Sequence, residues 1–161
     1  GGGGARALAG RDASRMRSGS TASDGGRSAP SSPAAPPTVL LVEDSVANQK
    51  LTGRLLRQMG YGCDIAENGQ VCLDLILPHI DRGAPCPYPL IFMDREMPVM
   101  NGLKATRALR ARGLDVPIIA ITGNALQEDR EQFLAAGATE VLTKPVRLGD
   151  LRRSLATLME E

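Results

Sequence analysis

Short apolar runs without polar alternation recur along this chain, and each ends in polar residues before a helical pattern starts. The run Leu90-Ile91-Phe92-Met93 is the plainest of them: it delivers Asp94, and a turn at Pro98 and Asn101-Gly102 follows. Strands that are apolar on both faces are typical of parallel sheets covered by helices on either side. This run therefore constrains the fold more than any other feature, and it favours a layered α/β domain.

Five strands alternate with five helices from Thr38 onward, which predicts a parallel, doubly wound sheet with right-handed crossovers. The order 2-1-3-4-5 would place a crevice between strands one and three, at the carboxyl ends where ligands bind in such sheets. The expected strands cover residues 39–42, 61–66, 90–93, 116–121 and 139–142. The expected helices are one capped by Ser45 and ended by Gly60, one from Asn68-Gly69 to about Pro78, one from Gly102 to Gly113, one over 125–136 ended by Gly137, and one carrying Leu148, Leu151, Leu155 and Leu158. Their apolar positions include Val46, Leu51, Leu75, Leu126 and Leu134.

Residues 1–37 differ in composition from the rest of the chain. They are built from Gly, Ala, Ser, Pro and Arg, with Leu8 and Met16 as their only large apolar side chains. Such a segment buries too little apolar surface to offset the entropy of ordering, so we expect a disordered linker before a folded domain at 38–161. The linker has no signal-peptide core, and the chain is expected to be a piece of a longer protein.

Charge and cysteine content exclude several classes of function. No window approaches the 18 apolar residues of a membrane span, so no membrane contact is expected from this segment. The linker carries a net charge of about +3 and the remainder about −2, without the concentrated basic face that nucleic-acid binding requires. Three cysteines without Cys-x-x-Cys spacing indicate neither a disulfide framework nor a zinc site, which favours a cytoplasmic location.

The polar residues that follow the apolar strands are of unusual types. Glu43 and Asp44 follow the first strand, Asp94 the third, Thr122 the fourth and Lys144 the fifth. Clustered carboxylates repel one another and need a cation, and hard oxygen ligands suit Mg²⁺. A carboxylate beside such a metal and an ammonium can act as a nucleophile toward phosphorus. We therefore expect Asp94 to accept a phosphoryl group, Lys144 to neutralise it and the Thr122 hydroxyl to bind one of its oxygens.

These stretches resemble a known family, the response-regulator receiver domains of two-component phosphorelays, and most closely those attached to hybrid sensor histidine kinases. The resemblance is carried by Leu-Leu-Val-Glu-Asp-Ser before Asn48-Gln49, Met-Asp-Arg-Glu-Met-Pro-Val-Met-Asn-Gly, Ile-Thr-Gly-Asn-Ala and Thr-Lys-Pro. It implies a flavodoxin-like fold with Asp94 as phosphoacceptor and with Thr122 and Lys144 as the switch hydroxyl and the phosphate-binding lysine. Mg²⁺ would be held by Glu43, Asp44, Asp94 and the backbone carbonyl of Glu96.

The resemblance also implies partners and a limit on activity. The phosphoryl donor would be a histidine kinase or a histidine-containing phosphotransfer domain, because the chain's single histidine, His79, lacks the neighbours expected of a donor. Such a domain catalyses only its own phosphorylation and dephosphorylation, although the parent chain would be a histidine kinase. Glu96 and Asn124 flank the site and are expected to tune dephosphorylation. Val141 stands where the family often has an aromatic switch residue.

Two other readings fit the sequence less well. A phosphohydrolase of the haloacid dehalogenase type also uses an Asp nucleophile, Mg²⁺, a Thr or Ser and a Lys, but it carries the nucleophile after its first strand in an Asp-x-Asp pair. Here Asp94 follows the third strand and Glu96 lies two residues on. A receiver-like interaction module that is never phosphorylated would usually lack an acid, the Thr or the Lys, and none of these is missing.

Overall fold

The structure, a computed structural model, describes residues 37–159. The expected linker therefore lies, apart from Pro37, outside the described residues. Within the described range no helix has both the length and the apolarity to cross a membrane.

The described strands form one sheet in which every neighbouring pair is parallel. Their order is β2-β1-β3-β4-β5, which confirms the predicted topology. The register pairs Leu41 with Phe92 and Phe92 with Ile119, so the apolar side chains stack in rows across the sheet. The strands are β1 (Thr38–Val42), β2 (Gly62–Ala66), β3 (Ile91–Asp94), β4 (Ile118–Thr122) and β5 (Glu140–Thr143).

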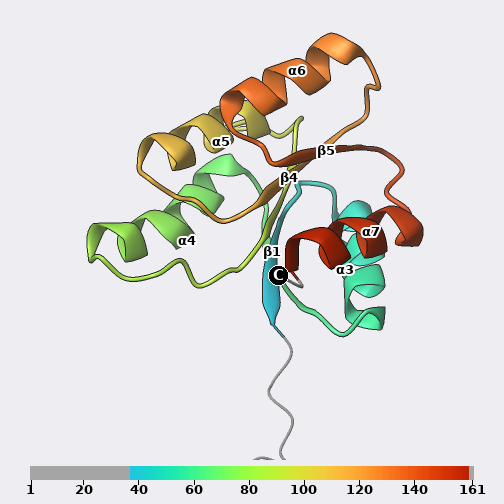
Figure 1. The fold of residues 1–161 in the computed structure, drawn as a ribbon, viewed down its shortest axis with the longest axis horizontal. Helices are drawn as coiled ribbons and strands as arrows, with labels where there is room; N and C mark the ends of the chain where they lie inside the picture. Colours follow the sequence, from blue (N-terminus) through green and yellow to red (C-terminus); the bar gives the residue numbers. More distant parts are fainter. Residues whose placement is uncertain (1–36, 160–161) are drawn as a thin grey trace, which may run out of the picture. The chain divides into compact units, whose positions relative to one another are not determined.

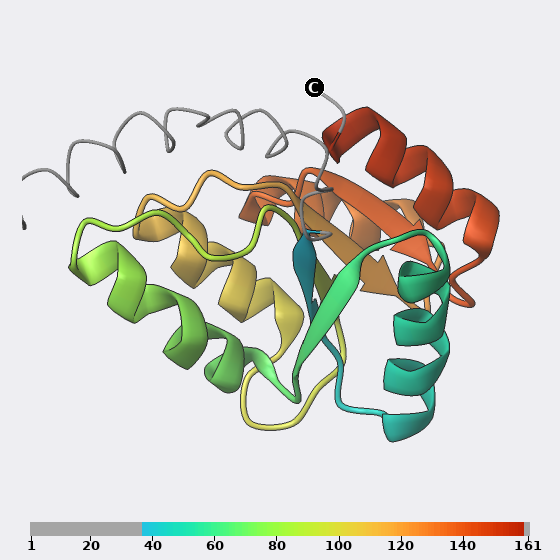
Figure 2. The ribbon, with the colours of Figure 1, turned by 90° about the horizontal axis from the view of Figure 1, so that it is seen from below.

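The helices form a layer on each face of the sheet (Figures 1 and 2). Helices α4, α5 and α6 cover one face, and α3 and α7 lie together on the other. This two-sided cover explains why β1, β3 and β4 are apolar at nearly every position, since neither of their faces meets water. The helices are α3 (Val46–Gln58), α4 (Gly69–Asp81), α5 (Gly102–Ala111), α6 (Gln127–Ala136) and α7 (Leu148–Met159).

Two apolar cores result, one on each face, because successive side chains of a strand point to opposite sides. The larger core lies under α4 and α5, where Leu40, Ile91 and Met93 are fully buried. The core under α3 and α7 is built around Phe92 and takes the alternate residues of the same strands. The predicted strands thus gain their stability from both layers of helices.

Most predicted helix boundaries are confirmed, and the structure shows the residues that cap the helices at two of these boundaries. Ser45 caps α3 by accepting a hydrogen bond from the Asn48 amide, and Gly137 ends α6 with φ of 113°, a conformation that favours glycine. The expected end of α4 near Pro78 is wrong, since the helix continues to Asp81. A proline removes one N–H from a helix, but the carbonyl of Pro78 still accepts from the Arg82 amide and closes the next turn.

The apolar positions of the helices are not all in the cores. Val46, Leu51, Leu75, Leu126 and Leu134 were expected on apolar helix faces, and all five are exposed. In α3 the side toward the sheet is formed by Thr52, Gly53 and Leu56 instead. The small Thr52 and Gly53 let the helix approach the sheet closely, and Val46 and Leu51 lie on its outer surface.

Candidate functional site

The polar residues that end the strands meet at one edge of the sheet, as the parallel topology requires. Glu43 and Asp94 are each only 2% exposed, and Thr122 is also buried. Asp44 is exposed at the rim, and Lys144 is half-buried. Buried carboxylates are unusual unless they are paired or bind a cation, so this edge is the candidate functional site.

Lys144 is the cation that pairs with these acids in the described part of the chain. Its Nζ lies 2.8 Å from Oδ1 of Asp94 and 3.7 Å from Oε1 of Glu43. Burial raises the pKa of Asp94 above its ordinary value, and the ammonium of Lys144 offsets this only in part. Burial and the charge of Asp94 likewise raise the pKa of Glu43. The Lys144 pKa is lowered by burial but rises on balance, because the carboxylates favour its charged form.

The acids of the site form a cluster with the composition of a hard-metal site. Glu43, Asp44 and Asp94 each offer a carboxylate oxygen, and these oxygens lie within 4.8 Å of one another. A single ammonium leaves this cluster with excess negative charge, which adds to the effect of burial in raising the pKa values of Glu43 and Asp94. Oxygen-only donors at this spacing fit Mg²⁺, whose remaining positions are usually filled by water.

Local hydrogen bonds fix the orientation of the first acid. The Glu43 amide donates to the carbonyl of Ala66 at 2.9 Å, which extends the β1–β2 pairing by one residue. The carbonyl of Glu43 accepts from Nε2 of Gln49 at 2.7 Å, and its Oε2 accepts from the Ser45 amide at 3.2 Å. The turn that starts α3 therefore also holds the Glu43 carboxylate at the site.

Thr122 and Lys144 are joined through the backbone of neighbouring strands. The Lys144 amide donates to the carbonyl of Thr122 at 2.8 Å, so both residues leave the sheet at the same level. The hydroxyl oxygen of Thr122 accepts from the Asn124 amide at 3.1 Å. The Asn124 side chain in turn accepts from the Leu126 amide at 3.1 Å, and it thereby shapes the loop that leads into α6.

The loop after Asp94 is compact and strained. The Met100 amide donates to the carbonyl of Pro98 at 2.7 Å across Val99, whose φ is 69°. This three-residue turn is rare, and a β-branched residue at its centre is strained. Gly102 closes the loop where a Cβ would collide with the carbonyl oxygen of Asp94, so only glycine fits there.

The side-chain contacts of Arg95 and Glu96 could not be predicted from the sequence pattern. The carboxylate of Glu96 is exposed and pairs with Arg95 at 3.1 Å, so its side chain points away from the acid cluster. Arg95 itself reaches across to Asp129 at the start of α6. A basic residue directly after the buried Asp94 was the available signal, but its partners come from a distant segment. The expected metal ligand, the backbone carbonyl of Glu96, stays a prediction.

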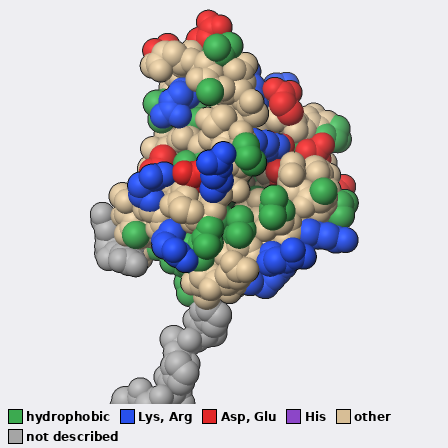
Figure 3. Space-filling view, turned by 90° about the vertical axis from the view of Figure 1, so that its right-hand side faces the viewer, with side chains coloured by type: hydrophobic (Ala, Val, Ile, Leu, Met, Phe, Trp, Pro, Cys, Tyr) green, Lys and Arg blue, Asp and Glu red, His purple; other side chains and the backbone are tan. Residues whose placement is uncertain are grey.

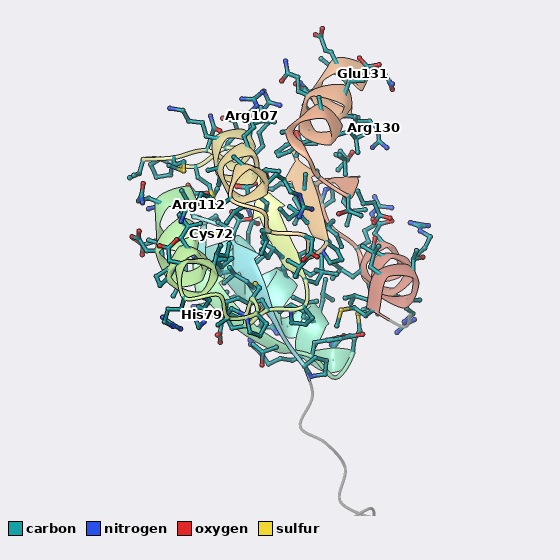
Figure 4. The ribbon with its side chains drawn as sticks, turned by 60° about the vertical axis from the view of Figure 1, so that its left-hand side comes forward. Cys72, His79, Arg107, Arg112, Arg130 and Glu131 are labelled. Carbon is teal, nitrogen blue, oxygen red and sulfur yellow. The ribbon has the colours of Figure 1, made fainter. Side chains whose placement is uncertain are left out.

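His79 lies far from the site along the fold. It occupies the last turn of α4, and helices in this topology run back toward the amino ends of the strands (Figure 4). Its Nδ1 lies 3.1 Å from a guanidinium nitrogen of Arg82 on the exposed surface. The expectation that the phosphoryl donor is another domain or protein stays a prediction.

Residues 39–156 match the family model described as the response regulator receiver domain. Two-component system protein A of Emericella nidulans is 42% identical over 118 residues, which are 73% of this chain and 17% of that protein. Hybrid signal transduction histidine kinase I of Dictyostelium discoideum is 38% identical over 77% of this chain and 7% of its own length. Two-component response regulator ORR41 of rice is 40% identical over 67% of this chain and 83% of its own length. The chain thus spans a small part of the first two relatives and most of the third.

Solved structures agree with these relatives. The receiver domain of the sensor histidine kinase PA1611 from Pseudomonas aeruginosa, crystallised with a magnesium ion in its active site cleft, is 36% identical; the match covers 79% of this chain and all of that one, with a TM-score of 0.65. The receiver domain of the yeast response regulator Ssk1, solved with the histidine phosphotransfer protein Ypd1, is 29% identical over 79% of this chain and 91% of that one, with a TM-score of 0.65. The five-stranded order, the edge of buried acids, the family model and these relatives lead to one conclusion: this chain belongs to the response regulator receiver domains of two-component systems.

Proposed function

We propose that this domain, at residues 38–161, accepts a phosphoryl group from a phosphohistidine donor onto Asp94. One observation carries the proposal: the buried Asp94 carboxylate lies 2.8 Å from the Lys144 ammonium and beside two further carboxylates. This arrangement gives a nucleophile, a counter-charge for the incoming phosphoryl oxygens and the ligands of a divalent cation. A merely structural ion pair would not need the other two acids.

The transfer forms one bond and breaks another. A carboxylate oxygen of Asp94 attacks phosphorus, the P–N bond of the phosphohistidine breaks, and its electron pair returns to the imidazole nitrogen of the donor. Lys144 stays protonated because the neighbouring carboxylates raise its pKa, so its charge is available to the transferring phosphoryl group. The buried Thr122 hydroxyl lies at the end of the next strand and would donate to a second phosphoryl oxygen.

The residues fit a magnesium ion as the resident metal. Glu43, Asp44 and Asp94 would hold it through carboxylate oxygens, together with the backbone carbonyl of Glu96 and water. When bound, Mg²⁺ supplies positive charge that offsets the repulsion between the carboxylate nucleophile and the phosphoryl oxygens. Burial raises the pKa values of Glu43 and Asp94, and repulsion from a neighbouring carboxylate raises each of them further, which supports a cation as the group that would keep both acids ionised.

An apolar patch lies beside the site on the face formed by α3 and α7. Figure 3 shows hydrophobic side chains gathered on this face with lysines and arginines around them. Val46 and Leu51 on α3 are exposed there, and Leu51 also lines a cavity of about 260 Å³ with Lys144 and Pro145. Apolar side chains next to the acceptor suit a donor protein better than a small-molecule donor. We infer that a histidine kinase or histidine-containing phosphotransfer domain docks here.

The chain's origin is part of the proposal. Its likeness to a hybrid kinase supports an origin in the C-terminal part of a hybrid histidine kinase, with residues 1–37 as a linker and a cytoplasmic location. Binding of nucleic acid or membrane by this segment is not part of the proposed function.

Intact mass spectrometry would test the acceptor directly. The purified chain is incubated with a small phosphoramidate and Mg²⁺, beside an Asp94→Asn variant and a sample with chelator. One added phosphoryl mass that is lost in both controls is expected. No added mass on folded protein would favour a phosphate-independent interaction module, and steady release of phosphate from ordinary phosphomonoesters would favour a hydrolase of the haloacid dehalogenase type.

A matched pair of variants would test the donor surface. Leu51 on α3 and Leu134 on α6 are almost equally exposed, at 47% and 48%, but they lie on opposite faces of the sheet. Leu51→Asp should slow phosphotransfer from a phosphorylated histidine phosphotransfer protein at least tenfold and leave phosphoramidate labelling unchanged. Leu134→Asp should leave both rates unchanged. Equal effects of the two variants would refute docking on the α3 and α7 face.

A further inference from the structure

The helices on the two faces of the sheet differ in charge. Within their bounds, α3 and α7 carry five basic residues and one acid, Asp150. The helices on the other face, α4, α5 and α6, carry four basic and five acidic residues. Residues 38–161 have a net charge of about −2, so the fold gathers positive charge on one face although the domain as a whole is slightly acidic.

Three of these positive charges form a stripe along α3. Lys50, Arg54 and Arg57 recur at positions i, i+4 and i+7, which lie on one side of an α-helix, and all three are exposed. This basic stripe spans about 10 Å of the helix axis. Like charges at such spacing destabilise a helix, and α3 contains no acid that would relieve the repulsion. Stability of the helix therefore gives no reason for the stripe.

The basic stripe makes no ion pair within the part of the chain that the structure describes. No carboxylate of residues 37–159 lies within ion-pair distance of its three charged groups. The one acid on α7, Asp150, already pairs with Arg153 at 2.8 Å. The positive charge of α3 is therefore available to acidic groups of a partner.

Apolar side chains beside the basic stripe indicate the class of partner. Val46 and Leu51 of α3 are 60% and 47% exposed. Arg152 of α7 adds a positive charge where it lines a cavity with Met59 and Tyr61, directly after α3. Figure 3 shows lysines and arginines around hydrophobic side chains on this face. Protein interfaces combine an apolar centre with a polar rim, whereas DNA is bound largely through its phosphates, which do not cover apolar side chains. This face fits a protein better than a nucleic acid.

We propose that the phosphodonor of this domain is a protein with an acidic surface, and that Lys50, Arg54 and Arg57 select it. The inference rests on the proposed function, since it names the charge of the partner that brings the phosphoryl group. Acidic side chains around the donor's phosphohistidine would lie against the basic stripe, while apolar side chains of the donor cover Leu51. Opposite charges arranged in this way accelerate association and disfavour donors whose surface is basic.

Phosphotransfer at two salt concentrations would test the charge of the donor. The donor probe is a histidine phosphotransfer domain with a net acidic surface, phosphorylated on its histidine and mixed with the full chain and Mg²⁺. The second-order rate constant is expected to fall at least tenfold between about 50 and about 300 mM NaCl, because salt screens charges across the interface. A second donor, in which amides replace the acids around the histidine, should react at least tenfold more slowly at low salt.

A matched pair of double variants would assign the effect to α3. Lys50→Glu with Arg54→Glu reverses two exposed charges on α3, and Lys104→Glu with Arg107→Glu reverses two exposed charges on α5, on the other face of the sheet. The α3 variant should slow transfer from the acidic donor at least tenfold at low salt and lose most of the salt dependence. The α5 variant should stay within about twofold of wild type.

Labelling by phosphoramidate separates donor selection from damage to the acceptor. Both double variants should gain the phosphoryl mass at the wild-type rate, because neither changes a residue of the acid cluster. Thermal melts identify a variant that fails to fold. Lys50→Gln with Arg54→Gln then carries the test, and it should slow transfer from the acidic donor about threefold at low salt, because it removes the charges without reversing them.

Several results would contradict an acidic donor. Transfer that does not depend on salt, equal slowing by the α3 and α5 variants, or equal rates from the acidic and the amide donor would each overturn the inference. Salt-dependent binding of wild type to a DNA duplex that the α3 variant loses, without preference for the acidic donor, would assign the basic stripe to nucleic acid instead. Failure of the proposed function has its own signature, since wild type would then gain no phosphoryl mass from phosphoramidate, and the inference would fall with it.

Discussion

The two edges of the sheet differ in how well the protein compensates the charged groups that lie there. At the amino edge, the half-buried guanidinium of Arg110 donates to the carbonyls of Gly137, Leu114 and Val116 at 2.8 to 2.9 Å. At the carboxyl edge, Glu43, Asp44 and Asp94 share one ammonium. The first cation donates to three neutral carbonyls. The acids at the other edge have more negative charge than the protein itself neutralises.

This difference separates the part of the fold that supplies stability from the part that does chemistry. A half-buried charge that donates to several fixed carbonyls holds its segments in one arrangement, here the end of α5 against the segments that lead into β4 and β5. A cluster of carboxylates whose negative charge is only partly compensated lowers the stability of the fold. The same excess charge gives the site affinity for a cation, which in turn can bind an incoming phosphoryl group. The carboxyl edge is therefore expected to gain stability when the site is altered or filled, and the amino edge to lose it.

The largest effect is expected from Arg110→Met. Removing the guanidinium leaves three carbonyls without a donor, and the free energy of unfolding should fall by about 3 kcal/mol. Urea unfolding measures the loss, and Arg107→Met, an exposed arginine on the same helix (Figure 4), is the matched control with little effect. Phosphoramidate labelling per folded molecule should be unchanged. A loss no larger than that of the control would contradict the structural role given to Arg110.

The opposite sign is expected at the carboxyl edge. Asp94→Asn removes one of the crowded carboxylates, so in the absence of metal it should raise the free energy of unfolding by on the order of 1 kcal/mol. Addition of Mg²⁺ should stabilise wild-type protein, because the ion binds the folded state, and should have a much weaker effect on the variant. Urea unfolding with and without Mg²⁺ provides both numbers. If Asp94→Asn is less stable than metal-free wild type, the protein already compensates the negative charge of the carboxylates without a metal ion.

The site was more predictable from the sequence than the contacts that surround it. Glu43, Asp94, Thr122 and Lys144 each follow an apolar strand directly, and in a parallel sheet this alone brings them to one edge. The contacts of Arg110 depend on carbonyls that lie far away along the chain, and no local pattern encodes them. The same holds for Arg95 and α6.

Local sequence patterns were also insufficient to predict where one helix ends and which face of another helix packs on the sheet. The end of α4 was misjudged at Pro78 because Ile80, beyond the proline, still packs against the core under α4 and α5. Leu51 was expected on an inner face, since apolar spacing alone does not say which side of a helix can approach a sheet most closely. Tertiary packing decided both cases.

Tyr88 offers a smaller test of the amino half of the sheet. Its hydroxyl donates to Oδ2 of Asp64 on β2 at 2.8 Å, and burial, together with this carboxylate, raises the Tyr88 pKa to about 12. Tyr88→Phe should cost about 1 kcal/mol at neutral pH. Because the tyrosine pKa is higher in the folded than in the unfolded chain, this contribution is complete below about pH 10 and is lost as the pH rises through about 12.

Urea unfolding at several alkaline pH values would therefore show the two proteins converge. The stability difference between wild type and Tyr88→Phe should shrink from about pH 10 upward toward pH 12. A difference that stays constant over this range would mean that the hydroxyl contributes packing alone, without the charge-dependent bond to Asp64.

The smallest effect is expected where the carboxyl edge is strained. Val99 has φ of 69°, which is a strained conformation for valine, and it is 81% exposed, so burial of its side chain does not offset the strain. A left-handed conformation costs a non-glycine residue about 1 to 2 kcal/mol, and glycine loses about 0.5 to 1 kcal/mol through its freer unfolded chain. Val99→Gly should therefore raise the free energy of unfolding by roughly 0.5 to 1 kcal/mol. Val99→Ala, which keeps a Cβ at the same φ, separates this relief of strain from loss of the side chain and should give a smaller gain. A Val99→Gly protein that is less stable than wild type would mean that the loop tolerates its geometry without strain, and the contrast between a strained, under-compensated carboxyl edge and a satisfied amino edge would then rest on charge alone.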